Sequence, residues 1–495
     1  MRTFFNQSLL KIAVLAGVVS LCCAASCNKS TGTNGGGTPP PPPPPPPPVQ
    51  GAADVAWWLT KGNKSVLFQQ QTTPLSFTNT PNASAFTITV DTAQVFQEID
   101  GFGFTLTGGS AEHLLGMGQA ERTALLRELF AFDGNNIGIS YLRLSIGASD
   151  LSSSVFSYND LPAGQTDPQM TKFDLGPDKT TVIPVLKEIL AINPAIKIMG
   201  SPWSPPVWMK DNGDTRGGSL KPEWYDAYAR YFVKYIQEMG KEGIKIDAIT
   251  VQNEPLHPGN NPSLLMLAEQ QAAFIKQSLG PIFRSNNITT KIIIYDHNAD
   301  RPDYPITVLN DPEAKQYIDG SAFHLYGGQI DALSQVHNAH PDKNLYFTEQ
   351  WIGAPGNFPE DLKWHTANLT VGATRNWCRT VLEWNLTSNP TLTPYTDRGG
   401  CSQCLGAVTI SGNSVQRNPA YYILAHPSKF VRPGSKRISS NVSSTLPNVA
   451  FKTPDGKKVL IVLNSGGAAQ SFNVKQGART FTASLDAGAV ATYIW

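Results

Sequence analysis

Two acidic residues occupy positions at which apolar segments end. Glu254 follows the apolar run 248–251 in "AITVQNEP", and Glu349 follows the run 345–347 in "NLYFTEQW". Two carboxyl groups that face each other across a cleft can cleave a glycosidic bond, because one protonates the leaving oxygen while the other attacks the anomeric carbon. A single glutamate at a strand end is more often an ion-pair or capping group. The prediction therefore depends on the pair.

Amide and aromatic residues stand beside these glutamates. Asn253 directly precedes Glu254, where its amide could bind the 2-hydroxyl of a sugar and stabilise an oxocarbenium-like transition state. We therefore predict that Glu254 is the general acid/base and Glu349 the nucleophile. Tryptophans stack on sugar rings, although many are core residues, and a strand-end histidine can be purely structural. The further substrate-binding candidates are Trp203, His324, Tyr326 and Trp384.

The predicted mechanism requires a particular separation of the two carboxyl groups and a proton on one of them. Retention of the anomeric configuration requires a separation of about 5–5.5 Å, whereas about 6.5–9.5 Å would admit a water molecule between them. The negative charge of Glu349 is expected to raise the pKa of Glu254, which must carry a proton. The sequence has no histidine pair or acidic loop with ligand spacing, so no metal or other cofactor is predicted. Asp296, His297 and Asn298 are expected to support loops.

Apolar segments of strand length alternate with helical stretches from residue 97 onward. Such strands are covered on both faces and run parallel, and eight of these units predict an α/β fold, a closed (β/α)8 TIM barrel. In this fold the C-terminal ends of the strands surround the active site, which brings the two glutamates to one opening. The predicted strands are 97–107, 139–147, 196–203, 248–254, 291–298, 320–327, 344–351 and 379–386.

The segments on either side of the barrel have a different pattern. Residues 53–96 and 429–495 alternate Val, Thr, Phe and Ser and contain turn sequences such as "TPDGK", which is typical of antiparallel strands. Neither segment alone is expected to form a stable stack of sheets. We therefore predict one β-sandwich, built from both chain ends, beside a catalytic barrel that spans residues 97–428.

The N-terminus has the features of an export signal. Basic residues precede an apolar run at 12–23 that is too short to span a membrane. Small residues precede Cys27, as in a bacterial lipoprotein, although the usual leucine three residues earlier is missing. We predict a signal peptide over 1–26 and lipidation of Cys27 at the outer membrane or cell surface of a bacterium, with secretion as the alternative. The linker 27–52 contains a proline run that is expected to form an extended spacer.

Composition limits the possible partners. The chain has 495 residues, of which 41% are hydrophobic, and a formal net charge of +1. This is enough for a large core, while the balanced charge argues against nucleic acid as a partner, and we expect a monomer. Cys401 and Cys404 could form a redox pair or half of a metal site, but a local disulfide is favoured in an exported chain. Cys378 is expected to be buried and free.

Eight motifs occur in a recognisable order: "GFGFTLTGGSAEHLL", "YLRLSIGASDLS", "GSPWSPPVWMKDNG", "VQNEP", "HLYGG", "YFTEQW", "EWNLTSNP" and "YYILAHPSKFVRPGSKRI". In order and spacing they resemble glycoside hydrolase family 30, which includes lysosomal glucosylceramidase and bacterial β-1,6-glucanases. The resemblance extends from about residue 55 to Trp495. It implies a retaining mechanism, the same barrel and sandwich, and the same roles for Glu254 and Glu349. It also implies that the sugar is surrounded by Trp203, Asn253, His324, Tyr326, Trp384 and Asn389.

One motif departs from the family pattern. Glucosylceramidase-like members carry Thr-Asp after the first strand, and that aspartate binds hydroxyls of the terminal glucose, whereas here Thr107 is followed by Gly108 and Gly109. Losing a charged acceptor costs roughly 1.5–3 kcal/mol, so a pocket for a terminal glucose should suffer, while the glycines at Gly108 would leave space for a further sugar. We therefore predict retaining cleavage of β-D-glucosidic bonds by double displacement, above all in β-1,6-glucan. The alternatives are a glucosylceramidase-like exo-β-glucosidase and, remotely, a non-catalytic carbohydrate-binding lipoprotein.

Overall fold

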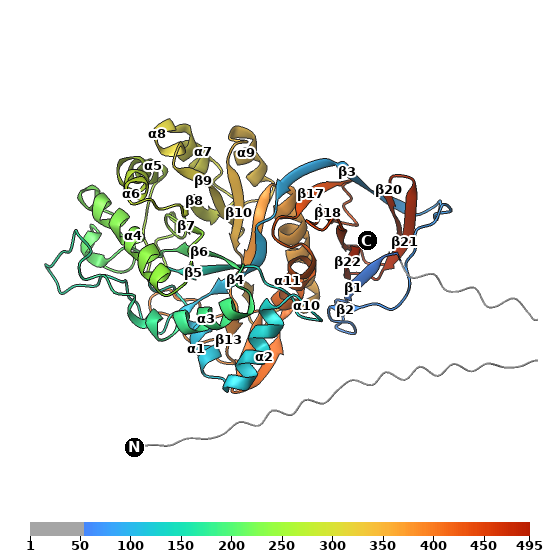
Figure 1. Ribbon diagram of the computed structural model, residues 1–495, viewed down its shortest axis with the longest axis horizontal. Coiled ribbons are helices and arrows are strands. Elements are labelled where there is room, and N and C mark those ends of the chain that lie inside the picture. The colour runs from blue at the N-terminus through green and yellow to red at the C-terminus, as the bar shows by residue number, and fades with distance from the viewer. Residues whose placement is uncertain (1–53) are drawn as a thin grey trace, which may run out of the picture. The chain divides into compact units, whose positions relative to one another are not determined.

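The computed structural model describes residues 54–495, which form a barrel and a β-sandwich (Figure 1). The predicted signal peptide, the linker and the lipidation site Cys27 lie outside the described residues. Among the helices of residues 54–495, none is long and apolar enough to cross a membrane.

Eight parallel strands close into a barrel, which confirms the predicted fold class. The strands follow one another around the barrel in chain order, and the last, β12, pairs with the first, β4. Each overlaps its predicted range. Cys378, the first residue of β12, is buried and unpaired. The barrel strands are β4 (Gly101–Leu106), β5 (Tyr141–Ser145), β6 (Lys197–Ser201), β7 (Ala248–Thr250), β8 (Lys291–Asn298), β9 (Ile318–His324), β10 (Asn344–Glu349) and β12 (Cys378–Glu383).

Helices surround the barrel and cover the outer faces of its strands (Figure 1). Their inner faces are apolar and aromatic; Tyr228 and Phe232 of α4, for example, pack on Phe274 of α5. This burial of apolar side chains on both faces of the strands stabilises a parallel sheet. The helices are α1 (Gly108–Leu115), α2 (Gln119–Phe130), α3 (Val182–Ile192), α4 (Tyr225–Lys241), α5 (Ala268–Phe274), α6 (Gly280–Ser285), α7 (Asp303–Asn310), α8 (Pro312–Lys315), α9 (Ala332–Ala339), α10 (Phe358–His365) and α11 (Pro419–Phe430).

Side chains fill the barrel interior in layers. The apolar layer takes one residue from each strand except β4, where Gly103 stands because a Cβ atom there would lie 1.8 Å from the carbonyl oxygen of Tyr141. Residues two positions further along a strand point to the same side, and in this barrel several of them are polar. They form the floor of the site described below. The apolar layer consists of Tyr141, Met199, Ala248, Ile293, Ala322, Tyr346 and Leu382.

The two chain ends form one β-sandwich, as predicted. Strand β3 (Phe86–Glu98) joins its layers, because its first residues pair in parallel with β20 while the remainder pairs antiparallel with β17. Ile88, Phe472 and Tyr493 belong to the shared apolar core. The other strands of this sheet are β1 (Ala56–Thr60), β2 (Gln69–Gln70), β17 (Lys436–Ser440), β18 (Asn448–Lys452), β19 (Lys458–Leu463), β20 (Gln470–Gln476), β21 (Arg479–Leu485) and β22 (Val490–Ile494).

Helix α11 connects the barrel to the sandwich through buried side-chain contacts. His426 on this helix contacts the hydroxyl oxygens of Thr60 and Thr492 at 2.9 and 2.8 Å, and these threonines belong to the first and last sandwich strands. Burial lowers the pKa of His426 to about 3, so the ring is neutral. Strand β3 continues to Glu98 and α11 to Phe430, slightly beyond the predicted domain boundaries.

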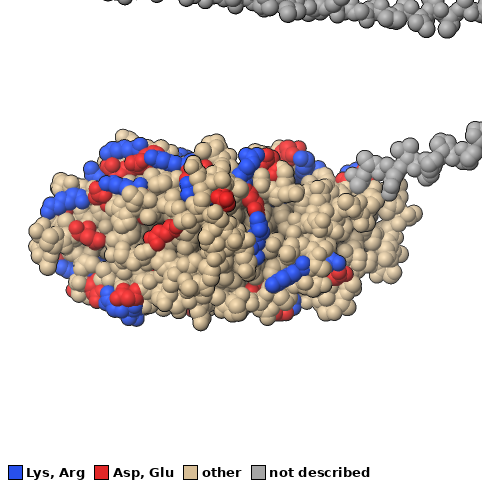
Figure 2. Space-filling view, turned by 90° about the horizontal axis from the view of Figure 1, so that it is seen from below, with Lys and Arg blue, Asp and Glu red and all other residues tan. Residues whose placement is uncertain are grey.

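Two small sheets lie on the loops of the barrel. One pairs β11 (Ile352–Gly353) with β14 (Cys404–Leu405), and the other contains β13 (Thr387–Ser388), β15 (Val408–Ser411) and β16 (Ser414–Arg417). On the face of the molecule in Figure 2, basic and acidic side chains are interspersed between large uncharged areas. Such a surface has no field of one sign that would attract a highly charged polymer.

Candidate active site

A buried ion pair occupies the polar layer of the barrel. Arg143 of β5 and Asp296 of β8 are both fully buried, and Arg143 Nη2 donates to Asp296 Oδ2 at 2.8 Å. Burial would raise the pKa of Asp296, but Arg143 and His324 hold it well below its usual range. Asp296 also accepts hydrogen bonds from hydroxyl groups on three other strands. These donors are Ser201, Thr250 and Thr348.

The guanidinium group of Arg143 orients two groups of the site. Its Nη1 donates to Glu349 Oε2 at 2.6 Å, and its Nη2 donates to Asn253 Oδ1 at 2.6 Å. Since the Asn253 oxygen is occupied in this way, its NH₂ group remains as the donor that can reach a substrate. The guanidinium carbon lies 4.9 Å from the ring of Trp203. One buried cation therefore positions both the carboxylate and the amide.

Glu254 stands on a loop rather than in a strand. Strand β7 ends at Thr250, and beyond it the N–H of Asn253 donates to the carbonyl of Pro202 at 2.8 Å. Glu254 has a φ of 44°, in the left-handed region that is uncommon for residues with a side chain. Its N–H donates to the carbonyl of Asp296 at 2.9 Å. The predicted strand was therefore too long, and this tethered loop carries the carboxylate to the pocket.

His324 connects Glu254 to Asp296. Its Nδ1 lies 3.0 Å from Glu254 Oε1, and its Nε2 lies 3.1 Å from Asp296 Oδ1. Burial disfavours an imidazolium, but Glu349, Asp296 and Glu254 together raise the pKa of His324 to about 9. At neutral pH the ring is therefore protonated and donates a hydrogen bond to a carboxylate on each side.

The pKa of Glu254 shifts in the direction opposite to our prediction. Burial raises it, but the imidazole groups of His297 and His324 outweigh burial and bring the pKa below its usual range. His297 Nδ1 lies 3.5 Å from the Glu254 oxygen that His324 contacts. The expected raising of the pKa by Glu349 is therefore not the dominant effect. We infer that the Glu254–His324 pair holds one proton jointly, rather than Glu254 alone.

Glu349 faces Glu254 across the same histidine. Tyr326 Oη donates to Glu349 Oε1 at 3.0 Å. This Oε1 atom lies 3.8 Å from His324 Nδ1, and Glu254 Oε1 lies 3.0 Å from the same nitrogen. The two oxygens cannot be further apart than the sum of these distances. This upper limit on their separation lies near the lower end of the spacing of about 6.5–9.5 Å between the carboxyl groups of inverting enzymes. A spacing of about 5–5.5 Å, as in retaining enzymes, lies within the limit.

The two glutamates line a pocket of about 390 Å³. Trp384 and Trp351 form part of its wall, together with the disulfide between Cys401 and Cys404. Trp203 packs against Trp384 with their ring centroids 5.5 Å apart, behind the wall rather than in it. Trp384 can therefore contact a sugar directly, whereas Trp203 supports Trp384 and Arg143.

Asn389 does not reach this pocket, contrary to what the family resemblance implied. Its side chain donates to Thr393 Oγ1 at 2.9 Å and accepts from the N–H of Thr391 at 3.1 Å. These bonds close the loop on which Asn389 itself stands. The residue shapes the loop and has no place in the pocket wall.

Gly108, predicted to leave space for a further sugar, lies outside the lining of the catalytic pocket. Gly108 begins α1, and a Cβ atom there would lie 3.3 Å from Ser152 Oγ. A Cβ atom on the next residue, Gly109, would lie 2.9 Å from Pro394. Neither glycine lines the catalytic pocket. Gly109 permits close packing of the loop that carries Pro394, whereas Gly108 is partly exposed and has only Ser152 beside it.

Asp150 is a carboxyl group of the pocket that we did not predict. It follows β5, lines the pocket and is 7% exposed. Burial, Glu349 and Glu254 raise the pKa of Asp150 to about 8, so at neutral pH it is protonated and can both donate and accept. The pocket therefore contains an additional carboxyl group, although glycine replaces the aspartate of the family's Thr-Asp sequence.

Arg143 was missed as well, although the sequence contains a signal for it. In "YLRLSIG" it lies two residues after Tyr141, so both side chains point into the barrel. A charge at an interior position needs a buried partner. A charged residue at such a position is therefore expected to have a functional or structural role. Asp296 could not be found in this way, because β8 is irregular between Tyr295 and His297. The alternation of side chains that point into and out of the barrel is lost there.

Three residues of this cluster have the spacing of metal ligands. Glu254, His297 and His324 each offer one ligand atom, and these atoms lie within 4.8 Å of one another. Each ring nitrogen of His324 already contacts a carboxylate, Nδ1 that of Glu254 and Nε2 that of Asp296. The cluster is therefore suited to sharing a proton, and double displacement at a glycoside needs no metal.

Two carboxylates close to one histidine nitrogen, at the mouth of a (β/α)8 barrel, form the kind of site that glycoside hydrolases use. Comparison with protein families gives the same class. The model of the glycosyl hydrolase family 30 TIM-barrel domain matches residues 99–431, and that of the family 30 beta sandwich domain matches residues 434–493. The chain belongs to glycosyl hydrolase family 30.

The similar proteins include endo-1,6-glucanases and glucosylceramidases. An endo-1,6-beta-D-glucanase from Aspergillus fumigatus is 35% identical over 79% of this chain and 83% of its own. A solved structure of an endo-beta-1,6-glucanase is 36% identical, with a TM-score of 0.83 over 90% of this chain and 99% of its own. The lysosomal acid glucosylceramidase of Mus musculus is 28% identical over 82% of this chain and 83% of its own.

Replacing His324 should change how stability depends on pH. Because the folded protein raises the pKa of His324 from 6.5 to about 9, its ion pairs stabilise the fold fully below about pH 6.5, and this contribution is lost as the pH rises through 9. The free energy of unfolding should fall by a few kcal/mol between these pH values in the wild type, and by less in His324→Gln. Urea unfolding across this pH range measures the difference.

The control for this experiment is His257→Gln. His257 is an exposed residue of the same pocket, and no carboxylate contact to it occurs within residues 54–495. This variant should keep the wild-type slope. Asp150, with its pKa raised to about 8, also loses stabilisation as the pH rises, and it is present in all three proteins. An unchanged slope in His324→Gln would mean that no imidazolium links the two carboxylates.

Proposed function

We propose that this family 30 enzyme is an endo-β-1,6-glucanase that cleaves glucan with retention. The observation that carries the mechanism is the placement of Glu254 and Glu349, whose Oε1 atoms lie 3.0 and 3.8 Å from one nitrogen of His324. The linkage is supported by the relatives: the two endo-1,6-glucanases are 35% and 36% identical to this chain, and the glucosylceramidase is 28% identical.

We assign the attack on the anomeric carbon to Glu349. Its carboxylate is held by Arg143 on one oxygen and by the hydroxyl of Tyr326 on the other, which fixes its orientation toward the pocket. As the glycosidic C–O bond breaks, Glu349 forms an ester bond to the sugar, and the leaving oxygen takes the proton held by Glu254 and His324. A water molecule then attacks the sugar carbon, returns its proton to Glu254 and releases Glu349. The NH₂ group of Asn253 is placed to donate to the 2-hydroxyl.

Azide should distinguish the roles of the two glutamates. Glu349→Ala and Glu254→Ala should each lower turnover of an activated aryl glucoside by about 10²-fold or more. In the first variant azide replaces the nucleophile and the product is the α-glucosyl azide. In the second, azide attacks the enzyme-bound sugar and gives the β-glucosyl azide. Nuclear magnetic resonance of the products identifies the anomer, and the reverse assignment of anomers would exchange the two roles.

The products released from polymer should establish the mode of action. Wild-type protein should convert β-1,6-glucan to short oligosaccharides, because an enzyme that cuts inside a chain releases fragments of several sizes. Glu349→Gln should abolish the products, while Glu121→Gln, at an exposed site on α2, should not. Chromatography of the products over time measures the outcome. Glucose as the sole product, chiefly from an alkyl β-glucoside, would reject the endo mode.

Asp150 favours a second candidate, an exo-β-glucosidase of the glucosylceramidase kind. Its protonated carboxyl group in the pocket wall could bind hydroxyls of a terminal glucose, as the aspartate of that group does. The glucosylceramidase relative also matches over most of both chains. The product analysis above separates the two candidates, since only the exo enzyme yields glucose alone.

We further propose that the protein is exported and lipid-anchored through Cys27, and that it acts there as a monomer. The support is the apolar segment before "AASC" and the proline-rich spacer after it. Such a spacer would hold the barrel clear of the membrane.

A fatty-acid label should report the anchor directly. In a bacterial host, a clickable palmitate analogue should label the wild-type protein and direct it to the detergent phase on Triton X-114 extraction. Cys27→Ser should lose the label, whereas Cys22→Ser, within the predicted signal peptide, should keep it. Unlabelled wild-type protein in the culture medium would instead show plain secretion.

A further inference from the structure

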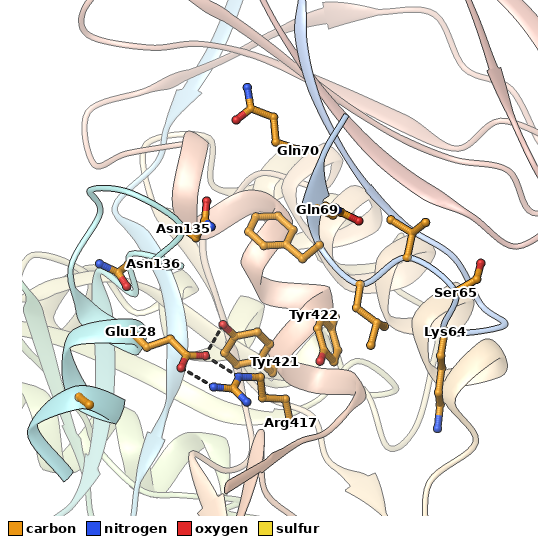
Figure 3. A pocket seen from close by; sticks show the side chains of 14 residues that line it. Lys64, Ser65, Gln69, Gln70, Glu128, Asn135, Asn136, Arg417, Tyr421 and Tyr422 are labelled. Atoms are coloured by element: carbon orange, nitrogen blue, oxygen red, sulfur yellow. Dashed lines mark hydrogen bonds and ion pairs between the residues drawn. The ribbon is translucent and has the colours of Figure 1, made fainter. Parts of the chain in front are cut away.

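A second hollow lies between the barrel and the sandwich (Figure 3). It has a volume of about 970 Å³ and shares no lining residue with the catalytic pocket. One side is the segment 64–70, which precedes and includes strand β2 of the sandwich, and the other is formed by α2, the loop after it and the start of α11. We name it the junction hollow. Ligand pockets of up to about 1,000 Å³ commonly form at such junctions between domains.

The segment 64–70 has a fixed position beside the hollow. The N–H of Phe68 donates to Thr60 Oγ1 at 3.0 Å. The ring of Phe68 packs on that of His426, with their centroids 5.1 Å apart. These contacts hold the centre of the segment against α11. They leave Gln69 and Gln70, on the two-residue strand β2, exposed at the rim. Because the backbone is fixed on both sides of the hollow, binding a ligand does not carry the entropic cost of ordering a loop.

The acid and the guanidinium group that line the junction hollow are paired with each other. Arg417 Nε donates to Glu128 Oε1 at 2.6 Å, and Tyr421 Oη donates to the same oxygen at 2.7 Å; Figure 3 shows these three side chains joined. The further cation, Lys64, lies with its Nζ 5.1 Å from the centroid of the Phe358 ring. Because the acid and the guanidinium are paired, Lys64 is the one unpaired charge among the described lining residues, and the hollow offers no free guanidinium to a phosphorylated or acidic ligand.

Amide groups at the rim supply the polar contacts. Gln69, Gln70 and Asn135 are exposed, and within residues 54–495 their side-chain amides have no hydrogen-bond partner. Figure 3 shows Asn135 on one side of the hollow and Gln69 on the other, with Tyr421 below them, beside Glu128. An amide offers both donors and acceptors, and this suits hydroxyl groups, which also do both. A polyhydroxylated, uncharged ligand therefore fits this lining.

We propose that the junction hollow is a second saccharide-binding site, which holds a neutral glucan strand apart from the strand in the catalytic pocket. That the saccharide is a glucan rests on the proposed function; that it is neutral and polyhydroxylated rests on the lining alone. Two attachment points on one polymer raise the effective concentration of the chain at the catalytic pocket. The site would thus favour polymer over short glucosides.

Binding stoichiometry tests this site. The full chain carrying Glu349→Gln, which does not consume the probe, is titrated calorimetrically with a β-1,6-linked gluco-oligosaccharide, and two sites are expected. Adding Q69A, Q70A and N135A together should weaken one site by about tenfold or more, since each lost hydrogen bond costs about 0.5–1.5 kcal/mol. Adding Trp384→Ala should weaken the other. These rim side chains are exposed, so folding should not depend on them.

A matched control removes amides of the same kind elsewhere. Q329A, Q335A and N338A change exposed amides on and before α9, which have no side-chain hydrogen-bond partner within residues 54–495, and both sites should persist. The proposal is overturned if the parent has one site that Trp384→Ala removes, if the rim variant keeps both sites, or if only an acidic polysaccharide occupies the hollow. If wild-type enzyme fails to cut β-1,6-glucan, the proposed function fails separately. Binding of another neutral glucan that the rim variant abolishes would still support the second site.

Discussion

The ion pair between Arg143 and Asp296 underlies the arrangement of the whole site. Removing two charges from water costs several kcal/mol for each, and their attraction offsets this only when further hydrogen bonds satisfy both groups. Here Asp296 is satisfied by hydroxyls from three strands and by His324. Arg143 reaches Glu349 and Asn253. A shift of any strand from β5 to β10 would break one of these hydrogen bonds, so the network holds the ends of these strands in one relative position.

The same network sets the charge that the substrate meets. Two cations, Arg143 and protonated His324, face the carboxylates of Asp296, Glu254 and Glu349, while Asp150 is neutral at pH 7 because its pKa is about 8. The cluster therefore carries net negative charge in a site that is largely closed to water. Such a field stabilises the positive charge that develops on the sugar ring in the transition state.

The sandwich is connected to the barrel by the chain itself and by buried hydrogen bonds. Strand β3 leads directly into the first barrel strand, and α11, the last barrel helix, is bonded through His426 to strands from both chain ends. Arg375, which follows the helical segment after α10, also donates to the carbonyls of Asn448 and Ser440 at 2.6 and 2.9 Å. Buried contacts of this kind oppose relative motion of the two domains. The junction hollow is consequently a preformed feature of the fold.

Much of this protein follows from local pattern. Alternating apolar and helical segments determine the barrel, the period-two flanks determine the sandwich, and the strand ends locate Glu254, Glu349 and Asn253, because these properties depend on neighbours in the chain. The family resemblance adds their chemistry. Asp150 and the pKa of Glu254 could not be obtained in this way. The pKa depends on which distant groups approach within a few ångströms, and only tertiary packing places His324 beside Glu254 and Ser152 beside Gly108. Short-range electrostatics and steric exclusion act through space, so one sequence read in order does not contain their partners.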